Sequence, residues 1–231
     1  NTISQVRIKE INETSDGILE FKVSRSDYNT QSYEYTGVTV SQPPAQTTNT
    51  PVSIGYSDTL FIEVPPLNSG DSVPRYYAVT HGYARPGWPG AALYKSADGG
   101  NTYLLTGSIN AKSTFGLVAI ATPAPTKGYY VWDDTTTISV TLKQGTLSTL
   151  TDLAVQNGQN WAMVGEELIG FVNATLTAPD TYTLSRLLRG RKGSEVKCDS
   201  HLANELFVLI DAAPLKISLS TTDIGKTLKY K

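Results

Sequence analysis

Short runs in which apolar and polar residues alternate dominate the chain. The clearest example lies in residues 5–25, where two alternating runs flank Ser15-Asp16-Gly17. An Asp-Gly pair between two such runs indicates a β-hairpin, because glycine tolerates the positive φ that a tight turn requires. The sequence therefore predicts an antiparallel hairpin in this first segment.

A stretch with few apolar residues follows the predicted hairpin. Residues 27–35 are mostly polar, and residues 41–51 contain Pro43, Pro44 and Pro51 among Thr, Gln and Asn. Such a segment contributes little to a core, and its prolines interrupt any strand. We expect a linker or a long external loop here. Residues 1–52 would then form an N-terminal strand region, and residues 53–231 the main β-rich domain.

The rest of the sequence predicts short strands with a turn about every ten residues. Turn signals at residues 165–166 and 178–180 predict two consecutive hairpins, which together make a meander. Only residues 148–156 show the 3 to 4 residue apolar spacing of a helix. The expected fold class is all-β, with short antiparallel strands in small barrels or sandwiches and little helix. The expected strands are residues 60–64, 76–80, 91–95, 103–105, 115–121, 138–142, 162–164, 167–171, 173–176, 182–188, 206–210, 215–219 and 227–230.

Charge and composition exclude several classes of function. The chain has 19 Lys and Arg against 21 Asp and Glu, so its net charge of -2 gives no basis for long-range attraction to nucleic acid. A single cysteine, Cys198, cannot form an internal disulfide, and two histidines, His81 and His201, are too few for a Cys/His metal cage. No apolar run is long enough to span a membrane. We expect no sequence-specific nucleic-acid binding, no metal, no cofactor and no stable membrane anchor.

Catalytic motifs are also missing from the sequence. No Gly-x-Ser-x-Gly elbow surrounds any serine, so we interpret His81 and His201 as structural or surface residues. Asp133 and Asp134 are neighbours, and neighbouring residues of a strand point to opposite faces, which argues against shared acid-base chemistry. The sequence predicts that the chain is not an enzyme.

Residues 96–103 read Ser-Ala-Asp-Gly-Gly-Asn-Thr-Tyr and resemble the Asp-box of sialidases and related propellers. In that motif the aspartate accepts backbone N–H bonds across a turn, and glycine permits the tight geometry. Sialidases carry several copies of the box, away from their catalytic residues, whereas this chain has one. We therefore predict a structural hairpin turn, made by Ser96, Asp98, Gly100, Thr102 and Tyr103.

One cluster of basic residues lies within residues 186–193. Its two glycines lack the spacing of a phosphate-binding loop, and no strand-to-helix context follows. Arginine is suited to bidentate contacts with carboxylates. The cluster is therefore interpreted as a solvated turn or as an ion-pair interface with another subunit, with Arg186, Arg189, Arg191 and Lys192 as the candidate interface residues.

Aromatic residues suggest glycan binding as an alternative function. Trp88 with Tyr76, Tyr77, Tyr83 and Tyr94 could stack on sugar rings, or could cap the end of a small barrel. The second interpretation needs no ligand. A glycan-binding β module of a virion or cell-surface protein nevertheless stays open as the alternative function.

A longer series of residues resembles a known family. Residues 184–195 read Leu-Ser-Arg-Leu-Leu-Arg-Gly-Arg-Lys-Gly-Ser-Glu, His201 follows, and residues 205–211 read Glu-Leu-Phe-Val-Leu-Ile-Asp. This series is similar to a stretch of the phage tail proteins, a family that includes the large hub, or host-specificity, protein of gene transfer agents and of many long-tailed phages. Residues 87–100 and 157–171 match the same family in the same order. Lys192 and Ser194 stand where the family usually has Arg and Thr.

The resemblance implies a function in a virion. It implies a β-rich ring of three copies at the tail tip or baseplate hub, with a structural part in tail assembly, host attachment and DNA delivery. The partners would be other tail proteins, namely the distal tail protein, tail fibres and tape measure, and a host-surface glycan would be a further ligand. Assembly would take place in the cytoplasm of the bacterial host, and the chain would be an internal segment of a longer protein.

Overall fold

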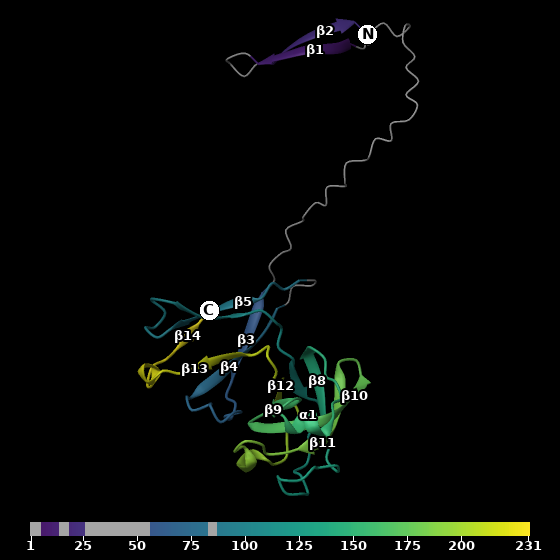
Figure 1. Ribbon diagram of the computed structural model, residues 1–231, viewed down its shortest axis with the longest axis vertical. Coiled ribbons are helices and arrows are strands. Elements are labelled where there is room, and N and C mark those ends of the chain that lie inside the picture. Colours follow the sequence, from purple (N-terminus) through teal and green to yellow (C-terminus); the bar gives the residue numbers. More distant parts are fainter. Residues whose placement is uncertain (1–5, 14–18, 26–55, 83–86) are drawn as a thin grey trace. The chain divides into compact units, whose positions relative to one another are not determined.

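The computed structural model describes residues 6–13, 19–25, 56–82 and 87–231 (Figure 1). The chain divides into two compact units, Asn1–Thr50 and Pro51–Lys231. The expected boundary between residues 52 and 53 lies outside the described residues. The structure is 44% strand and 6% helix, which confirms the predicted all-β fold class.

The first unit contains the predicted hairpin. β1 (Val6–Glu13) and β2 (Leu19–Arg25) pair in antiparallel fashion, with a shift in register between Ile8 and Glu10. Lys22 and Glu10 lie opposite each other and form an exposed ion pair at 3.6 Å. The predicted Asp16-Gly17 turn lies outside the described residues.

Six strands of the second unit form a closed antiparallel barrel (Figure 1). Their order around the barrel is β10-β11-β8-β7-β12-β9, and β9 pairs with β10 to close it. The consecutive hairpins β9-β10 and β10-β11 confirm the predicted meander. The strands are β7 (Phe115–Val118), β8 (Ile138–Gln144), β9 (Trp161–Val164), β10 (Glu167–Ala178), β11 (Thr181–Leu188) and β12 (Leu206–Leu209).

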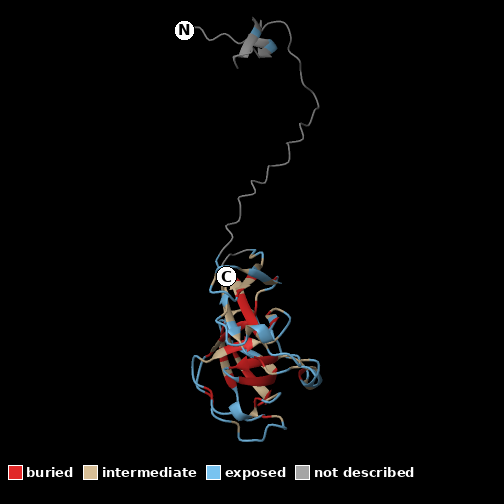
Figure 2. Cartoon of the chain, turned by 90° about the vertical axis from the view of Figure 1, so that its left-hand side faces the viewer, coloured by how far each residue is buried: buried red, intermediate tan, exposed pale blue. Residues whose placement is uncertain are grey.

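The barrel is buried on both of its faces along β9 and the first half of β10, within the buried interior of the second unit (Figure 2). Ile169 and Phe171 alternate with Leu168 and Val172, so one pair packs in the barrel interior and the other in a cluster outside it. The sequence predicted two strands here, residues 167–171 and 173–176. The structure instead has one strand of 12 residues, because pairing with β9 at its start and with β11 from Gly170 to Ala178 makes it continuous.

Two three-stranded sheets complete the second unit. The first has the order β13-β4-β3 and the second the order β14-β5-β6. They share a small core of Ala78, Leu93, Ile109 and Ile217. Tyr77 of β4 also packs in the cluster outside the barrel, which joins the first of these sheets to it. The strands are β3 (Ser57–Ile62), β4 (Arg75–Gly82), β5 (Ala91–Ser96), β6 (Leu104–Ile109), β13 (Leu215–Ser218) and β14 (Lys229–Tyr230).

Helices are short. The one α-helix among the described residues, α1 (Asp152–Gln156), lies within the predicted segment 148–156. The Thr151 side chain caps it by accepting a hydrogen bond from the Ala154 amide at 3.3 Å. Two 3₁₀ turns are η1 (Glu195–Lys197) and η2 (Thr221–Asp223). Within the described residues, no helix has the length and apolar character needed to cross a membrane.

Candidate functional site

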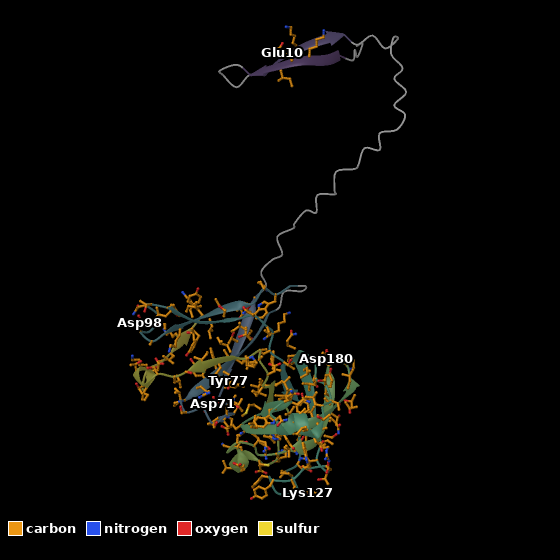
Figure 3. All side chains as sticks on the ribbon, in the orientation of Figure 1. Glu10, Asp71, Tyr77, Asp98, Lys127 and Asp180 are labelled. Carbon is orange, nitrogen blue, oxygen red and sulfur yellow. The ribbon has the colours of Figure 1, made fainter. Side chains whose placement is uncertain are left out.

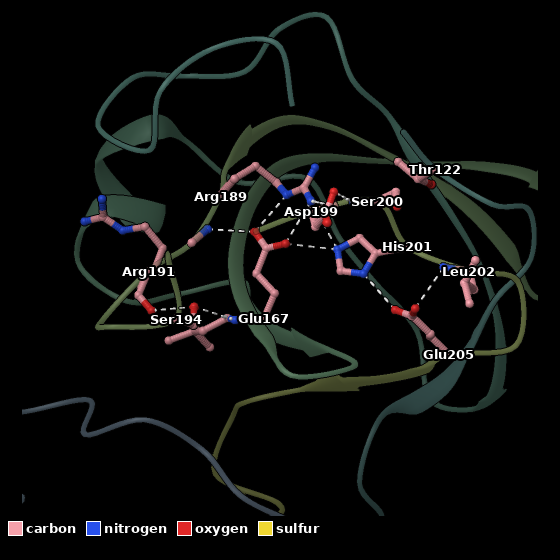
Figure 4. Close-up of polar contacts among 12 residues, drawn as sticks. Thr122, Glu167, Arg189, Arg191, Ser194, Asp199, Ser200, His201, Leu202 and Glu205 are labelled. Atoms are coloured by element: carbon pink, nitrogen blue, oxygen red, sulfur yellow. Dashed lines mark hydrogen bonds and ion pairs between the residues drawn. The ribbon is translucent and has the colours of Figure 1, made fainter. Parts of the chain in front are cut away.

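Polar side chains close one end of the apolar barrel interior. Glu167 begins β10 in phase with Ile169 and Phe171, so its side chain follows theirs into the barrel. Arg189 follows β11 in phase with Leu187 and meets Glu167 there. His201 and Glu205, from the connection between β11 and β12, complete the group. We call Glu167, Arg189, His201 and Glu205 the barrel-end network (Figure 4).

Arg189 and Glu167 form a bidentate ion pair at the centre of this network. Arg189 Nε donates to Glu167 Oε1 and Nη2 donates to Oε2, both at 2.8 Å. Glu167 is 0% exposed and Arg189 2% exposed. Burial of two charges is costly, and it is offset only when the remaining bonding positions are satisfied. The Gly190 amide donates to Glu167 Oε1 at 2.7 Å, and Arg189 Nη2 donates to the Asp199 carbonyl at 2.9 Å.

His201 lies between two carboxylates. Its Nε2 is 3.0 Å from Glu167 Oε2, and its Nδ1 is 2.7 Å from Glu205 Oε2. Its Nε2 is also 3.2 Å from Arg189 Nη2, so the ring links the two carboxylates and the guanidinium. The backbone of His201 pairs with that of Thr122 through two hydrogen bonds of 2.8 Å, which fix the position of the ring.

The turn after β11 shapes the network. Gly190 has a φ of +56°, and a Cβ there would lie 3.1 Å from both Glu195 Cα and Cys198 Cβ. Glycine is therefore required at this position for two reasons: the positive φ, and the lack of room for a Cβ atom. Ser194 holds the turn against β10, because its Oγ accepts from the Leu168 amide at 3.0 Å and donates to the Arg191 carbonyl at 2.8 Å.

The electrostatics of the network favour fixed charges. Burial by itself raises the pKa of Glu167, but hydrogen bonds from His201, Arg189 and Gly190 outweigh it and hold the pKa below its usual range. Burial lowers the pKa of Arg189, and the Glu167 carboxylate more than reverses this effect. Burial, followed by the negative charge of Glu167, raises the pKa of the nearby Cys198 thiol to about 12.

This arrangement suits a structural role. Glu167, Arg189 and His201 are at most 4% exposed, so their polar atoms face one another and not the solvent. An acid-base residue must come within hydrogen-bond reach of the group on which it acts. The geometry supports a structural role, in which the ion pairs hold together β10, β11 and the segment that connects β11 to β12.

The structure corrects the prediction for Arg189. We expected Arg189 on a surface turn with Arg186, Arg191 and Lys192, but its side chain is buried and paired inside the chain. The physical reason is its register, which places it on the inward side of the barrel after Leu187. Its guanidinium is therefore not presented on the surface of this chain.

Arg186 is also engaged within the chain. It donates from Nε and Nη2 to the two carboxylate oxygens of Asp152, at 2.9 and 2.6 Å, and from Nη1 to Asp134 at 2.7 Å. Its guanidinium lies 4.9 Å from the centroid of the Trp132 ring. Arg186 thus ties α1 to the loop before β8 and keeps about a third of its side chain exposed. Lys192 is exposed, with Nζ 5.5 Å from the Trp161 ring centroid, and Arg191 is half-buried.

The Asp-box-like turn has the predicted hydrogen bonds. Asp98 accepts from the amides of Asn101 and Thr102 at 3.0 Å, and from the hydroxyls of Thr102 and Ser96 at 2.6 and 2.7 Å. These bonds hold the pKa of Asp98 well below its usual range, and the bond from the Thr102 side chain has the largest effect on that pKa. Gly100 has a φ of +102°, as its expected role requires. Tyr103 is half-buried, with Lys231 Nζ 4.1 Å from its ring centroid.

The aromatic residues of the alternative interpretation pack inside the sheet region. Trp88 donates to Ser57 Oγ at 2.7 Å and packs with Tyr76 on the small core. The hydroxyls of Tyr76 and Tyr230 are hydrogen-bonded to each other. Tyr77 is buried, and Tyr83 lies outside the described residues. These rings thus pack within the fold, but Tyr76 and Trp88 lie in the core of the two sheets and not at an end of the barrel, as we had expected.

A groove of about 820 Å³ lies beside the network, between the end of β3 and the turn after β9. Val64 and Met163 are buried in its wall, and Asp71, labelled in Figure 3, is at its edge. Asp71 pairs with Lys216 at 2.8 Å and also with Arg75. Across residues 6–13, 19–25, 56–82 and 87–231 there is no group of three His, Cys, Asp or Glu side chains placed to hold a metal ion.

Sequence reasoning missed the network itself. It interpreted His201 as a structural or surface residue but gave it no partner, and it gave Glu167 and Glu205 no role. The signal available was the alternation in β10, where a glutamate stands in phase with the inward-facing Ile169 and Phe171. An acid at such a position requires a buried cation, and Arg189 stands at the equivalent position after β11.

The comparison with protein families gives one match. Residues 113–208 match the family model described as Rcc01698-like, C-terminal. The match begins two residues before β7 and ends within β12, so it covers the barrel and all four residues of the network. No curated protein matches the chain. The barrel with its buried network is therefore the part of this chain that is similar to the Rcc01698-like C-terminal family.

Proposed function

We propose that the chain is a structural component of the tail tip or baseplate hub of a phage or phage-like particle. The observation that carries this proposal is the overlap between the family resemblance and the barrel-end network. Arg189, His201 and Glu205 all lie in the series of residues 184–211 that resembles phage tail hub proteins. Glu167 lies in the second matching segment, residues 157–171.

The overlap links the family resemblance to a specific contact in the fold. Residues that are far apart in the sequence, and that match the family in the same order, meet in one buried ion-pair network. Such a network requires matched partners, because a single unmatched charge inside a barrel would be strongly destabilising. The resemblance therefore concerns a fold-defining feature, and it supports a common barrel.

A hub is built from copies that present matching surfaces in a ring. We propose a homotrimer in the particle, in contact with the distal tail protein, tail fibres and tape measure. Of the four basic residues first considered, Arg191 and Lys192 stay as interface candidates. Lys192 is exposed and Arg191 half-buried, on the turn that the network holds rigid. They would meet a carboxylate-bearing surface of a neighbouring tail protein.

The test reverses a surface charge in the full-length protein within its particle. Lys192→Glu should reduce the yield of infectious particles by at least about tenfold, while leaving the urea midpoint of the isolated chain unchanged. Lys127→Glu, at another exposed lysine, is the matched control and should leave the yield near that of the parent. Wild-type yields for Lys192→Glu would remove this turn from the proposed interface.

A further inference from the structure

Asp133 lies beside the barrel-end network but has no direct bond to it among the described contacts. The backbones of Asp133 and Leu187 pair through two hydrogen bonds, of 2.8 and 2.9 Å. Arg189 is two residues beyond Leu187 on the same side. In such an antiparallel pair, diagonal neighbours are about 7–8 Å apart at Cα, which is within reach of a long side chain. Asp133 and Arg189 are each 2% exposed.

Each of the two residues has one buried polar atom that is left without a protein partner. Asp133 Oδ1 accepts three bonds, from the Thr135 amide at 3.0 Å, the Thr135 hydroxyl at 2.7 Å and the Thr136 amide at 3.0 Å, whereas Oδ2 accepts none. Arg189 uses Nε and Nη2 for Glu167 and the Asp199 carbonyl, whereas Nη1 donates to no protein atom. Two N–H donors and one carboxylate oxygen are thus buried at the same end of the barrel.

We propose that a single buried water molecule bridges Arg189 Nη1 and Asp133 Oδ2. The ligand must accept a hydrogen bond from a guanidinium and donate one to a carboxylate, and water does both. Buried polar groups are rarely left without any partner, because each such group costs free energy. The carboxylate is the charged form here, because hydrogen bonds from Thr136 and Thr135 outweigh burial and hold the pKa of Asp133 below its usual range.

The bridge adds Asp133 to the four residues of the barrel-end network, and the network then also fixes the loop between β7 and β8. Asp133 lies in the loop between β7 and β8, which carries exposed Tyr130 and Val131. Through the water, the Arg189 guanidinium would fix that loop as well as β10 and the β12 connection. The site is independent of the proposed tail function, because it depends on the contacts of this chain alone.

A double-mutant cycle on the full chain tests the bridge in solution. Asp133→Asn keeps an oxygen for the Thr135 and Thr136 amides, and Arg189→Lys keeps a positive charge but removes Nη1. We expect their effects on the unfolding equilibrium constant to be coupled by at least about threefold. Asp134→Asn is the matched control, because Asp134 pairs with Arg186, and its effect should add to that of Arg189→Lys. Additive effects for Asp133→Asn would overturn the proposal.

A crystal structure of the unmodified chain decides the case if Arg189→Lys does not fold. At better than about 1.8 Å resolution, we expect an ordered water within hydrogen-bond distance of both Asp133 Oδ2 and Arg189 Nη1. A direct bond between the two side chains would overturn the proposal. So would a dry site, with both atoms left unpaired.

Discussion

Arg189 donates two parallel hydrogen bonds of 2.8 Å to Glu167, in a position where neither side chain is more than 2% exposed. The pair takes the place of apolar packing at the end of the barrel interior. Its partners come from the start of β10 and from the residue after β11, with His201 added from the β12 connection. Three segments of chain are thus fixed by one carboxylate.

Removal of one partner of this pair should be strongly destabilising. We expect Arg189→Met to lower the free energy of unfolding by about 3–5 kcal/mol, because it leaves the Glu167 charge buried without its main partner. Urea denaturation followed by circular dichroism measures the change. Arg186→Met removes a partly exposed arginine and should shift the midpoint much less. Equal shifts of the midpoint for the two variants would show that the buried ion pair contributes no more to stability than the partly exposed one.

Stability should fall in acid through Glu167. The pKa of Glu167 in the folded chain lies below its ordinary value of 4.5. Its contribution is therefore fully present above pH 4.5 and is lost as the pH falls through the lower folded pKa. Glu167→Gln cannot titrate, so its free energy of unfolding should decrease less than that of the parent between pH 7 and about pH 3. Parallel pH profiles for the two proteins would contradict this assignment.

The Cys198 thiol should react slowly in the folded chain. Burial and the Glu167 charge raise its pKa from 9.0 to about 12, which lowers the fraction of thiolate at neutral pH roughly a thousandfold. Iodoacetamide labelling followed by mass spectrometry should show far slower modification in buffer than in denaturing urea. Labelling at the same rate in both conditions would mean that the thiol is neither shielded nor shifted.

Loss of the Asp98 carboxylate should weaken the turn between β5 and β6. Asp98→Ala leaves the amides of Asn101 and Thr102 without their acceptor, and we expect a lower urea midpoint. The control is Glu63→Ala, because Glu63 is also an exposed carboxylate and accepts no hydrogen bond from the described residues. A midpoint for Asp98→Ala that matches that of Glu63→Ala would argue against an anchoring role.

The sequence was sufficient to predict strands, turns and the Asp98 hydrogen bonds, because these depend on neighbours in the chain. Alternation and Asp-Gly or Gly-Glu turns are local signals, and β1, β2, β9 and β10 follow them. The position of Arg189 depends on the register of the β10–β11 hairpin and on the connection from β11 to β12, which bring together residues 22 and 12 positions apart. The basic turn alone does not distinguish an arginine on the surface from one that enters a barrel; its partner follows only when the in-phase acid Glu167 is combined with the register of β10 and β11.

A reconstruction of the tail of the parent particle by electron cryo-microscopy tests the proposed function most directly. The proposal predicts three copies of the six-stranded barrel around the tail axis at its tip, with the turn that carries Arg191 and Lys192 against a neighbouring protein. A tail tip without this barrel, in a map of sufficient resolution to trace strands, would contradict the proposal.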